Sequence, residues 1–212
     1  TAMVNDGQGT YSGTIPGSSV TQSGLLYYVM SQDVLGFSSS SDTLGAAVNF
    51  ASGTLTTNSA SGSAYPTGLP LDAWRLISTP AVLNETGLTQ VFDELGTQDN
   101  TIWRVFRYDD VSNTYKDNPV DLNSTESYWI YQKTEENLTM DTPAGKTGDM
   151  AGTEITLKTG WNFIGSPYPF QVPLQLDQVQ FYGPLTYGIS GESWSPVVTE
   201  LDPWNGYVVY NR

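Results

Sequence analysis

Residues 74–80 read WRLISTP and residues 161–167 read WNFIGSP, so a Trp-x-x-Ile-x-x-Pro frame occurs twice in the chain. Each frame is followed by two further anchors, which recur in the same order and at one constant offset. Matched anchors in a fixed order are the sequence signature of an internal structural repeat. The corresponding anchors are Tyr108 and Tyr115 with Tyr187 and Trp194, and YWIY at 128–131 with YVVY at 207–210.

The repeated region predicts β-structure. Aromatic and β-branched residues dominate the matched segments, as in short strands of a half-buried sheet. We therefore expect a pseudo-two-fold repeated β-sandwich or barrel over residues 71–212, with a first copy at about 72–142 and a second at about 153–212. Apolar residues at helical spacing before Gly96 predict one short helix at about 89–95.

Residues 1–57 form a separate unit of short strands divided by turns, at 11–15, 24–33 and 46–55. Residues 58–70 are rich in Ser, Gly, Thr and Pro, a composition typical of a linker. The chain as a whole is therefore expected to be all-β, with at most one or two short helices.

Two parts of the chain resemble known families. GTYSGTIP at 9–16, followed by GLLYYVMSQDVLG at 24–36, resembles the end of an immunoglobulin-like or fibronectin type III-like domain. From Asp72 onward the chain resembles the paired Trp-containing modules near the carboxyl-terminal parts of large secreted bacterial multidomain proteins. The first resemblance implies a partial sandwich with an open sheet edge, which favours strand addition by a partner. The second implies a secreted, modular protein and transfers no catalytic residue.

Composition excludes several classes of function. The 212 residues include 8 Lys and Arg, 22 Asp and Glu, no His and no Cys, for a formal net charge of -14. This charge repels nucleic acid and anionic lipid headgroups. Without imidazole and thiol, Ser-His and Cys-His catalytic pairs and the usual zinc ligand sets are excluded. No apolar run approaches the roughly 20 residues that span a bilayer, so we expect no membrane insertion.

Two of the six tryptophans are candidates for ligand contact. Trp194 and Trp204 lie beside Gly or Pro in loop-like sequence, where an exposed indole is able to stack on a sugar ring. The alternative interpretation is that tryptophans near repeat anchors are core residues, because each copy requires the same packing.

Carboxylates offer a possible calcium site. Asp109, Asp110 and Asp117 could supply oxygen ligands, as could Asp6 together with the carbonyls of neighbouring glycines. Neither group has the spacing of a dedicated calcium loop, so an acidic turn without an ion is the competing interpretation. Apart from calcium we expect no cofactor. The other carboxylates lie mostly in polar turns, which do not resemble the two-carboxylate cleft of a glycosidase.

Three Asn-x-Ser/Thr sequons occur in expected loops, at Asn84, Asn123 and Asn137. A glycan requires such placement, and the sites apply only if the source organism glycosylates asparagine in this context.

The polar residues of the chain are mostly uncharged, a bias that we associate with an extracellular or cell-surface location. We interpret the chain as a non-catalytic structural or adhesive module, whose partner is a protein: itself or the remainder of its parent polypeptide. Self-assembly would use strand complementation at the partial amino-terminal sheet. The alternative is a carbohydrate-binding accessory module of a secreted hydrolase that contacts surface glycans. A hydrolase in its own right is the third class considered.

Overall fold

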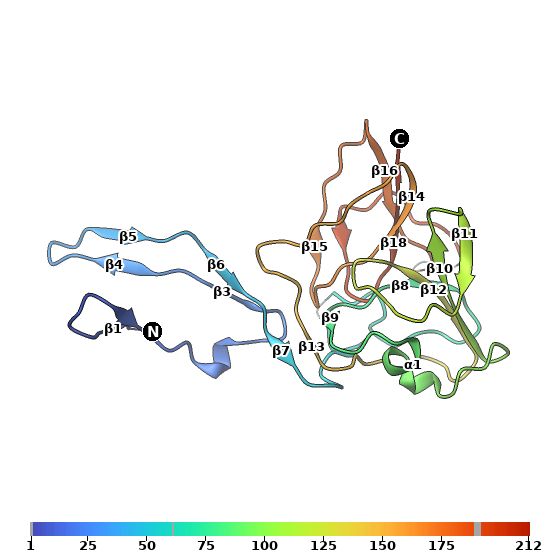
Figure 1. The fold of residues 1–212 in the computed structure, drawn as a ribbon, viewed down its shortest axis with the longest axis horizontal. Coiled ribbons are helices and arrows are strands. Elements are labelled where there is room, and N and C mark those ends of the chain that lie inside the picture. Colours follow the sequence, from blue (N-terminus) through green and yellow to red (C-terminus); the bar gives the residue numbers. More distant parts are fainter. Residues whose placement is uncertain (1, 61, 189–191) are drawn as a thin grey trace.

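The computed structural model describes residues 2–60, 62–188 and 192–212. The fold is all-β, and its sheets are antiparallel. It has two parts, which we call the body (residues 47–212) and the arm (residues 2–46), and the arm projects from one side of the body (Figure 1). Within the described ranges, no helix is long and apolar enough to cross a membrane.

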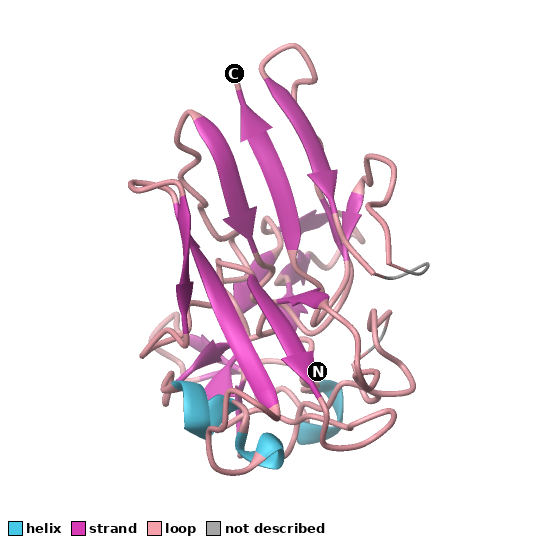
Figure 2. Ribbon diagram, turned by 90° about the vertical axis from the view of Figure 1, so that its right-hand side faces the viewer, coloured by secondary structure: helices cyan, strands magenta, loops and turns pink. Residues whose placement is uncertain are grey.

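Each copy of the repeat builds one sheet. In copy 1, strands β8 (Arg75–Ile77), β10 (Trp103–Asp109), β11 (Thr114–Asp117) and β12 (Tyr128–Gln132) pair in the order β11-β10-β12-β8. In copy 2, strands β14 (Gly160–Ile164), β16 (Phe181–Leu185) and β18 (Tyr207–Asn211) pair in the order β14-β18-β16. The two sheets lie one above the other in a single layer on the side opposite the arm (Figure 2).

The two sheets share strand order and register. Across copy 1, Leu76 pairs with Trp129 and Trp129 pairs with Phe106. At the corresponding places of copy 2, Phe163 pairs with Val208 and Val208 with Leu185. The repeat expected from the Trp-x-x-Ile-x-x-Pro frame is therefore present in the backbone pairing, in two open sheets and not in a closed barrel.

A pseudo-two-fold axis relates the copies. The end of β8 pairs with the segment before β18, and the end of β14 pairs in the same way with the segment before β12. Each contact has a counterpart in which the two copies exchange roles. The bridge Ile77–Asn205 corresponds to the bridge Ile164–Glu126. The hydrogen bond from Gly206 N to Leu76 O (2.8 Å) corresponds to the one from Ser127 N to Phe163 O (3.4 Å). The hydrogen bond from Ser78 N to Trp204 O (3.1 Å) corresponds to the one from Gly165 N to Thr125 O (2.9 Å).

The axis explains two glycines. Gly165 corresponds to Ser78, and a Cβ at Gly165 would lie 2.5 Å from the Cβ of Ser78. Gly206 corresponds to Ser127, and a Cβ there would lie 2.6 Å from that of Ser127. Equivalent positions meet at a two-fold axis, so there is room for one side chain per pair.

Trp204 lies in the core and is wrongly predicted as an exposed ligand contact. Its side chain is 1% exposed, and its Nε1 donates a hydrogen bond to the carbonyl of Thr56 at 3.1 Å. Although it belongs to copy 2, it packs with the core residues of copy 1, among them Trp103 and Tyr128. Loop-like flanking residues therefore did not indicate exposure, because the turn carries the indole inward.

Residues 58–70, which the composition predicts as a linker, are attached to the body by buried residues. Tyr65 and Leu69 are buried in the copy 1 core, and the Tyr65 hydroxyl donates to the carbonyl of Leu76 at 3.2 Å. Leu69 also exchanges backbone hydrogen bonds with Leu138. Two apolar anchors are enough to bind this Gly- and Ser-rich segment to the body.

Among the described residues of the two copies, helical turns occur only in copy 1. α1 (Leu88–Val91) is followed by the 3-10 turn η2 (Asp93–Leu95), close to the helix expected at about 89–95. Their apolar side chains enter the copy 1 core. Two small sheets complete the body: β7 (Asn49–Phe50), β13 (Gly145–Lys146) and β9 (Val82–Leu83) in the order β7-β13-β9, and β15 (Val172–Pro173) with β17 (Glu200–Leu201).

The arm is a chain of two-stranded ladders. β1 (Val4–Asn5) pairs with β2 (Tyr11–Ser12), and the 3-10 turn η1 (Gly17–Ser19) follows. β3 (Leu25–Tyr27) pairs with β6 (Leu44–Ala46), and β4 (Met30–Gln32) pairs with β5 (Ser38–Ser40). The structure therefore differs from the partial immunoglobulin-like sheet of the sequence interpretation, because no third strand and no second layer cover these ladders among the described residues.

Candidate functional site

The arm is the most apolar exposed region of the molecule. Of the 24 large hydrophobic residues that are exposed among those described, 13 belong to its 45 residues. They are Met3, Val4, Tyr11, Ile15, Val20, Leu26, Tyr28, Val29, Met30, Val34, Leu35, Phe37 and Leu44. Scattered exposed hydrophobic residues are normal, whereas a contiguous set marks an interaction surface.

The tip of the arm is the most exposed part of that surface. Val34 is fully exposed, and Leu35 and Phe37 are 79% and 73% exposed. The turn that carries them is held by Asp33, whose Oδ1 accepts hydrogen bonds from the backbone N–H groups of Leu35 and Phe37, both at 2.9 Å. Hydrogen bonds of this kind to an Asp side chain stabilise turns, so the apolar tip has a defined shape.

The base of the arm is joined to the body. Gln22 Nε2 donates to the carbonyl of Thr54 at 3.1 Å. Met150, from the segment between the two copies, lies against Gly24 and Gly45, where an added Cβ would meet Met150 atoms at 2.7 and 2.3 Å. These two glycines leave the space that Met150 occupies, so the body holds the arm at its base and leaves its tip free.

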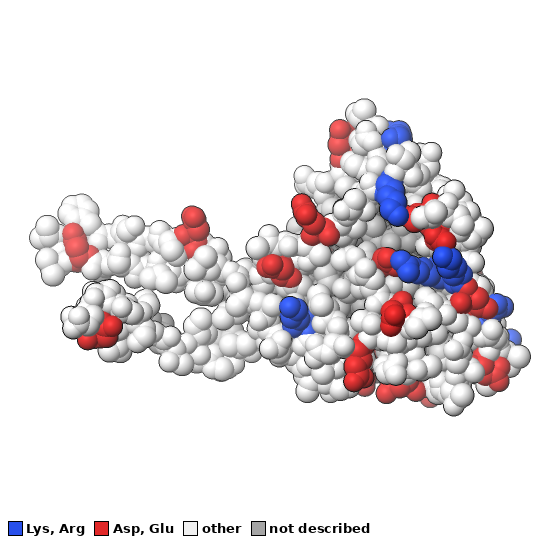
Figure 3. Space-filling view, in the orientation of Figure 1, with Lys and Arg blue, Asp and Glu red and all other residues white. Residues whose placement is uncertain are grey.

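The arm also differs from the body in charge. Its acidic residues are Asp6, Asp33 and Asp42, and the chain has no Lys or Arg before Arg75. Figure 3 accordingly shows an arm that is almost uncharged and a body that carries the basic side chains among many acidic ones.

The predicted calcium ligands do not form a site. Asp109 lies 2.5 Å from Lys116 Nζ, Asp110 lies 2.5 Å from Lys158 Nζ, and Asp117 lies 2.6 Å from Arg104. The hydrogen bond from Lys116 is the largest of the causes that lower the pKa of Asp109 to about 2. Each carboxylate therefore has its own cationic partner, which satisfies its charge without an ion.

Asp6 likewise has a local role. Its Oδ1 accepts hydrogen bonds from the backbone N–H groups of Gln8 (2.7 Å) and Thr10 (3.0 Å), which lower its pKa. The side chain shapes the turn between β1 and β2.

A cluster of carboxylates that the sequence did not reveal lies beside η2. Oxygens of Asp93, Glu94 and Asp141 all lie within 4.8 Å of one another. Glu94 Oε1 accepts a hydrogen bond from Asp141 N, while its Oε2 is buried without a partner among the described residues. Burial is the main cause that raises the pKa of Glu94 to about 7. Carboxylates so arranged could hold a cation, and the fold alone brings Asp141 to residues 93 and 94.

Trp194 remains exposed, as predicted. Its side chain is 46% exposed, and its ring makes edge contacts with Tyr187 (5.4 Å between centroids) and Trp129 (5.8 Å). Beside it, Glu192 accepts from Arg75 at 2.7 Å and from the Tyr187 hydroxyl at 3.4 Å.

The three sequon asparagines, Asn84, Asn123 and Asn137, are all exposed. Asn123 Oδ1 accepts hydrogen bonds from the N–H and the hydroxyl of Thr125, both at 3.0 Å. The side-chain placement that a glycan requires is therefore present at all three.

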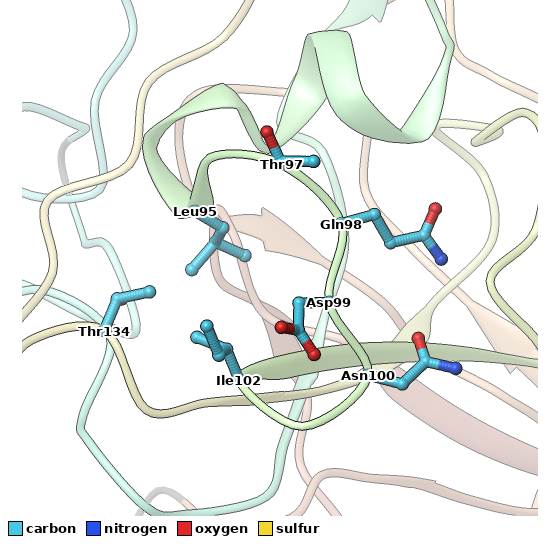
Figure 4. A pocket seen from close by; sticks show the side chains of 7 residues that line it. All are labelled: Leu95, Thr97, Gln98, Asp99, Asn100, Ile102 and Thr134. Carbon is cyan, nitrogen blue, oxygen red and sulfur yellow. The ribbon is translucent and has the colours of Figure 1, made fainter.

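Two concave regions of the described surface bear on function. The first is an open depression beside η2, where the side chains of Leu95, Ile102 and Thr134 face one another (Figure 4). Asp99 also lies there, but its Oδ1 is occupied by Thr101 N and Oγ1 at 2.8 and 2.7 Å. Among the described residues that line this depression, Asp99 is the one charged side chain.

The second region is a cleft of about 210 Å³ between the copies. Two ion pairs line it, Arg107 with Glu126 and Lys158 with Asp110, and so does Thr125. Thr125 corresponds to Trp204, so the cleft lies where the pseudo-two-fold axis would place a second buried indole. Four of its charged side chains are paired with one another, and Glu154 also lines it.

No protein-family model, curated protein or solved structure was found to match the chain.

Proposed function

We propose that the chain is a non-catalytic structural module of a secreted or cell-surface protein, and that it assembles with a second copy of itself through the arm. The observation that carries this proposal is the set of 13 exposed hydrophobic residues on the projecting arm. The largely uncharged polar composition and the absence of Cys and His support the location and the non-catalytic role.

The apolar surface of the arm requires a partner that buries it. A two-stranded hairpin is at best marginally stable in water, because neither of its faces is packed. Burying apolar surface stabilises by roughly 25 cal/mol per Å², so covering the arm offsets part of the cost of ordering it. Its outer strands also present unpaired backbone N–H and C=O groups, which another strand can pair with.

A second arm is the partner that fits best. Two arms meeting about a two-fold axis would bring like residues together, which requires a surface of low charge. The arm meets this condition, because three Asp residues are its only charged side chains and they are widely separated in sequence. The body carries the other 19 acidic residues against 8 basic ones, and this net negative charge would keep two bodies apart.

The test is the oligomeric state of the full chain with the tip altered. Sedimentation velocity is measured from about 1 to 200 µM for the wild type and for Leu35→Asp/Phe37→Asp. We expect the wild type to form dimers or larger species as concentration rises and the double variant to remain a 23.1 kDa monomer, because two charges would be desolvated in the contact.

The matched control is Val179→Asp, which adds a charge at an exposed valine of the body. It should associate like the wild type. A wild-type chain that stays monomeric over the whole range, or a double variant that associates as well as the control, contradicts the proposal.

A further inference from the structure

The outward side of the two sheets carries an unusual number of aromatic residues. Twelve aromatic side chains lie there, and we call them the outer aromatic face. Most of them alternate along a strand with residues that point into the core, and the others stack on these rings. Ring contacts join eleven of them into groups of two or three. The groups around Phe163 and Trp129 each contain rings from both copies. The twelve residues are Trp74, Phe106, Tyr108, Tyr115, Trp129, Tyr131, Trp161, Phe163, Tyr182, Tyr187, Trp194 and Tyr210.

One end of this face is exposed. Trp161, Tyr210 and Tyr182 lie directly opposite one another on β14, β18 and β16, so they form a row across the sheet. They are 41%, 37% and 45% exposed. A register shift between Tyr182 and Leu185 places Tyr182 in line with Tyr210. No described residue hydrogen-bonds to the indole N–H of Trp161 or to the hydroxyls of the two tyrosines.

In copy 1 the corresponding aromatic residues are more buried, and one of them is hydrogen-bonded. Trp74 and Tyr131 keep the same separation as Trp161 and Tyr210, 5.1 Å between ring centroids. There, however, both rings are partly buried, and the Tyr131 hydroxyl donates to Asp72. Arg104 takes the place opposite Tyr131. The repeat therefore does not require the row of copy 2 to be exposed and unpaired.

We infer that the row Trp161–Tyr210–Tyr182 is a binding site for a neutral polysaccharide chain. Sugar rings present C–H groups on their faces and hydroxyls at their edges, and aromatic faces carry the complementary negative potential. The rings of the row stand on neighbouring strands, which are about 4.8 Å apart, a spacing close to the width of one pyranose ring.

The polar groups around the row fit the same ligand. The free N–H and hydroxyls at the ring tips are suited to sugar hydroxyls. A net charge of -14 disfavours an anionic polysaccharide. An aliphatic protein surface would leave the ring-tip donors unpaired, which costs free energy once they are buried.

The test is affinity electrophoresis of the full chain in native gels that contain hydroxyethyl cellulose, xylan or mannan, with alginate as the anionic comparison. We expect retardation by at least one neutral polysaccharide and none by alginate. Trp161→Ala and Tyr182→Ala should each weaken binding about tenfold, the effect of losing one stacking contact. Tyr210→Phe should retain most of the binding, because it keeps the ring.

Val179→Ala, at an exposed valine in the turn before β16, is the matched control and should bind like the wild type. Near-ultraviolet circular dichroism checks that each variant keeps its fold. The inference is overturned if no neutral polysaccharide retards the chain, if alginate retards it equally, or if Trp161→Ala/Tyr182→Ala binds unchanged. Leu35→Asp/Phe37→Asp should bind normally, which separates this site from arm assembly.

Discussion

Copies 1 and 2 share their strand order and register, yet they use the shared frame differently. Copy 1 holds the larger core, which includes α1, the segment around Tyr65 and an indole borrowed from copy 2. Copy 2 has a smaller core. The counterpart of Trp204 in copy 1 is Thr125, which does not fill that core and lines an open polar cleft. On the outer face of copy 2 the row Trp161–Tyr210–Tyr182 is exposed, whereas the corresponding Trp74 and Tyr131 of copy 1 are partly buried. Copy 1 therefore contributes more of the buried core, and copy 2 has more aromatic surface available for contact.

Trp204 provides the largest test of this division. Trp204→Ala removes a fully buried indole and its hydrogen bond to Thr56, so we expect a loss of about 3–5 kcal/mol in the free energy of unfolding. Urea unfolding followed by circular dichroism measures the change. Trp194→Ala, which removes a half-exposed indole of the same copy, should cost less than half as much. Similar losses for the two variants would argue against the borrowed core.

The contact at the pseudo-two-fold axis is the second test. Gly165→Ala would place a Cβ 2.5 Å from both Ser78 Cβ and the carbonyl oxygen of Glu126, so we expect a loss of about 1–3 kcal/mol. Adding Ser78→Gly should restore part of that loss, because it clears one of three contacts shorter than 3.0 Å and leaves those with the carbonyl oxygens of Glu126 and Ser124. Thermal unfolding of the four chains in this cycle measures the coupling. Purely additive effects would show that the paired positions do not compete for space.

Glu94, which lies in the 3-10 turn η2 of copy 1, gives the smallest effect and one that depends on pH. Its pKa is raised from 4.5 to about 7 in the folded chain, so the folded state binds the proton more tightly than the unfolded state. Its contribution to stability is therefore complete below about pH 4.5 and is lost as the pH rises to about 7. Because the group is half-exposed, we expect a change of no more than about 1 kcal/mol.

The measurement is the free energy of unfolding at pH 4.5, 6 and 8 for the wild type and for Glu94→Gln. Subtracting the variant cancels the other carboxylates, several of which change with pH in the opposite direction. The difference between wild type and variant should fall as the pH rises. A difference that is constant or rises with pH would mean that Glu94 ionises normally in the folded chain.

Much of the body could be predicted because its pattern is local. The aromatic and β-branched runs predict the strands, the doubled Trp-x-x-Ile-x-x-Pro frame predicts two equivalent sheets, and the apolar spacing before Gly96 predicts the helical turn. Exposure was predicted less well. Flanking Gly and Pro pointed equally to Trp194 and Trp204, but a turn does not determine on which side of the chain its side chain packs.

The candidate sites show the same limit. The grouping of Asp109, Asp110 and Asp117 suggested an ion site, yet each lies beside a different basic residue, two of them close in sequence and one, Lys158, from the segment leading into β14. The row Trp161–Tyr210–Tyr182 was not predicted, because its three members are brought into line only by strand pairing and by a register shift within β16. Cross-strand register depends on both strands at once, and neither strand records it alone.

The amino-acid sequence by itself determined the all-β class, the presence and order of two copies, and the exclusion of imidazole and thiol chemistry. Each of these depends only on residue type and on spacing along the chain. The tertiary structure alone decided that residues 58–70 pack into the core, that Trp204 serves the opposite copy, and that the arm stands uncovered. Those outcomes depend on contacts between segments far apart in the chain, where the gain from burial is set by the shape of the partner surface as much as by the residue itself.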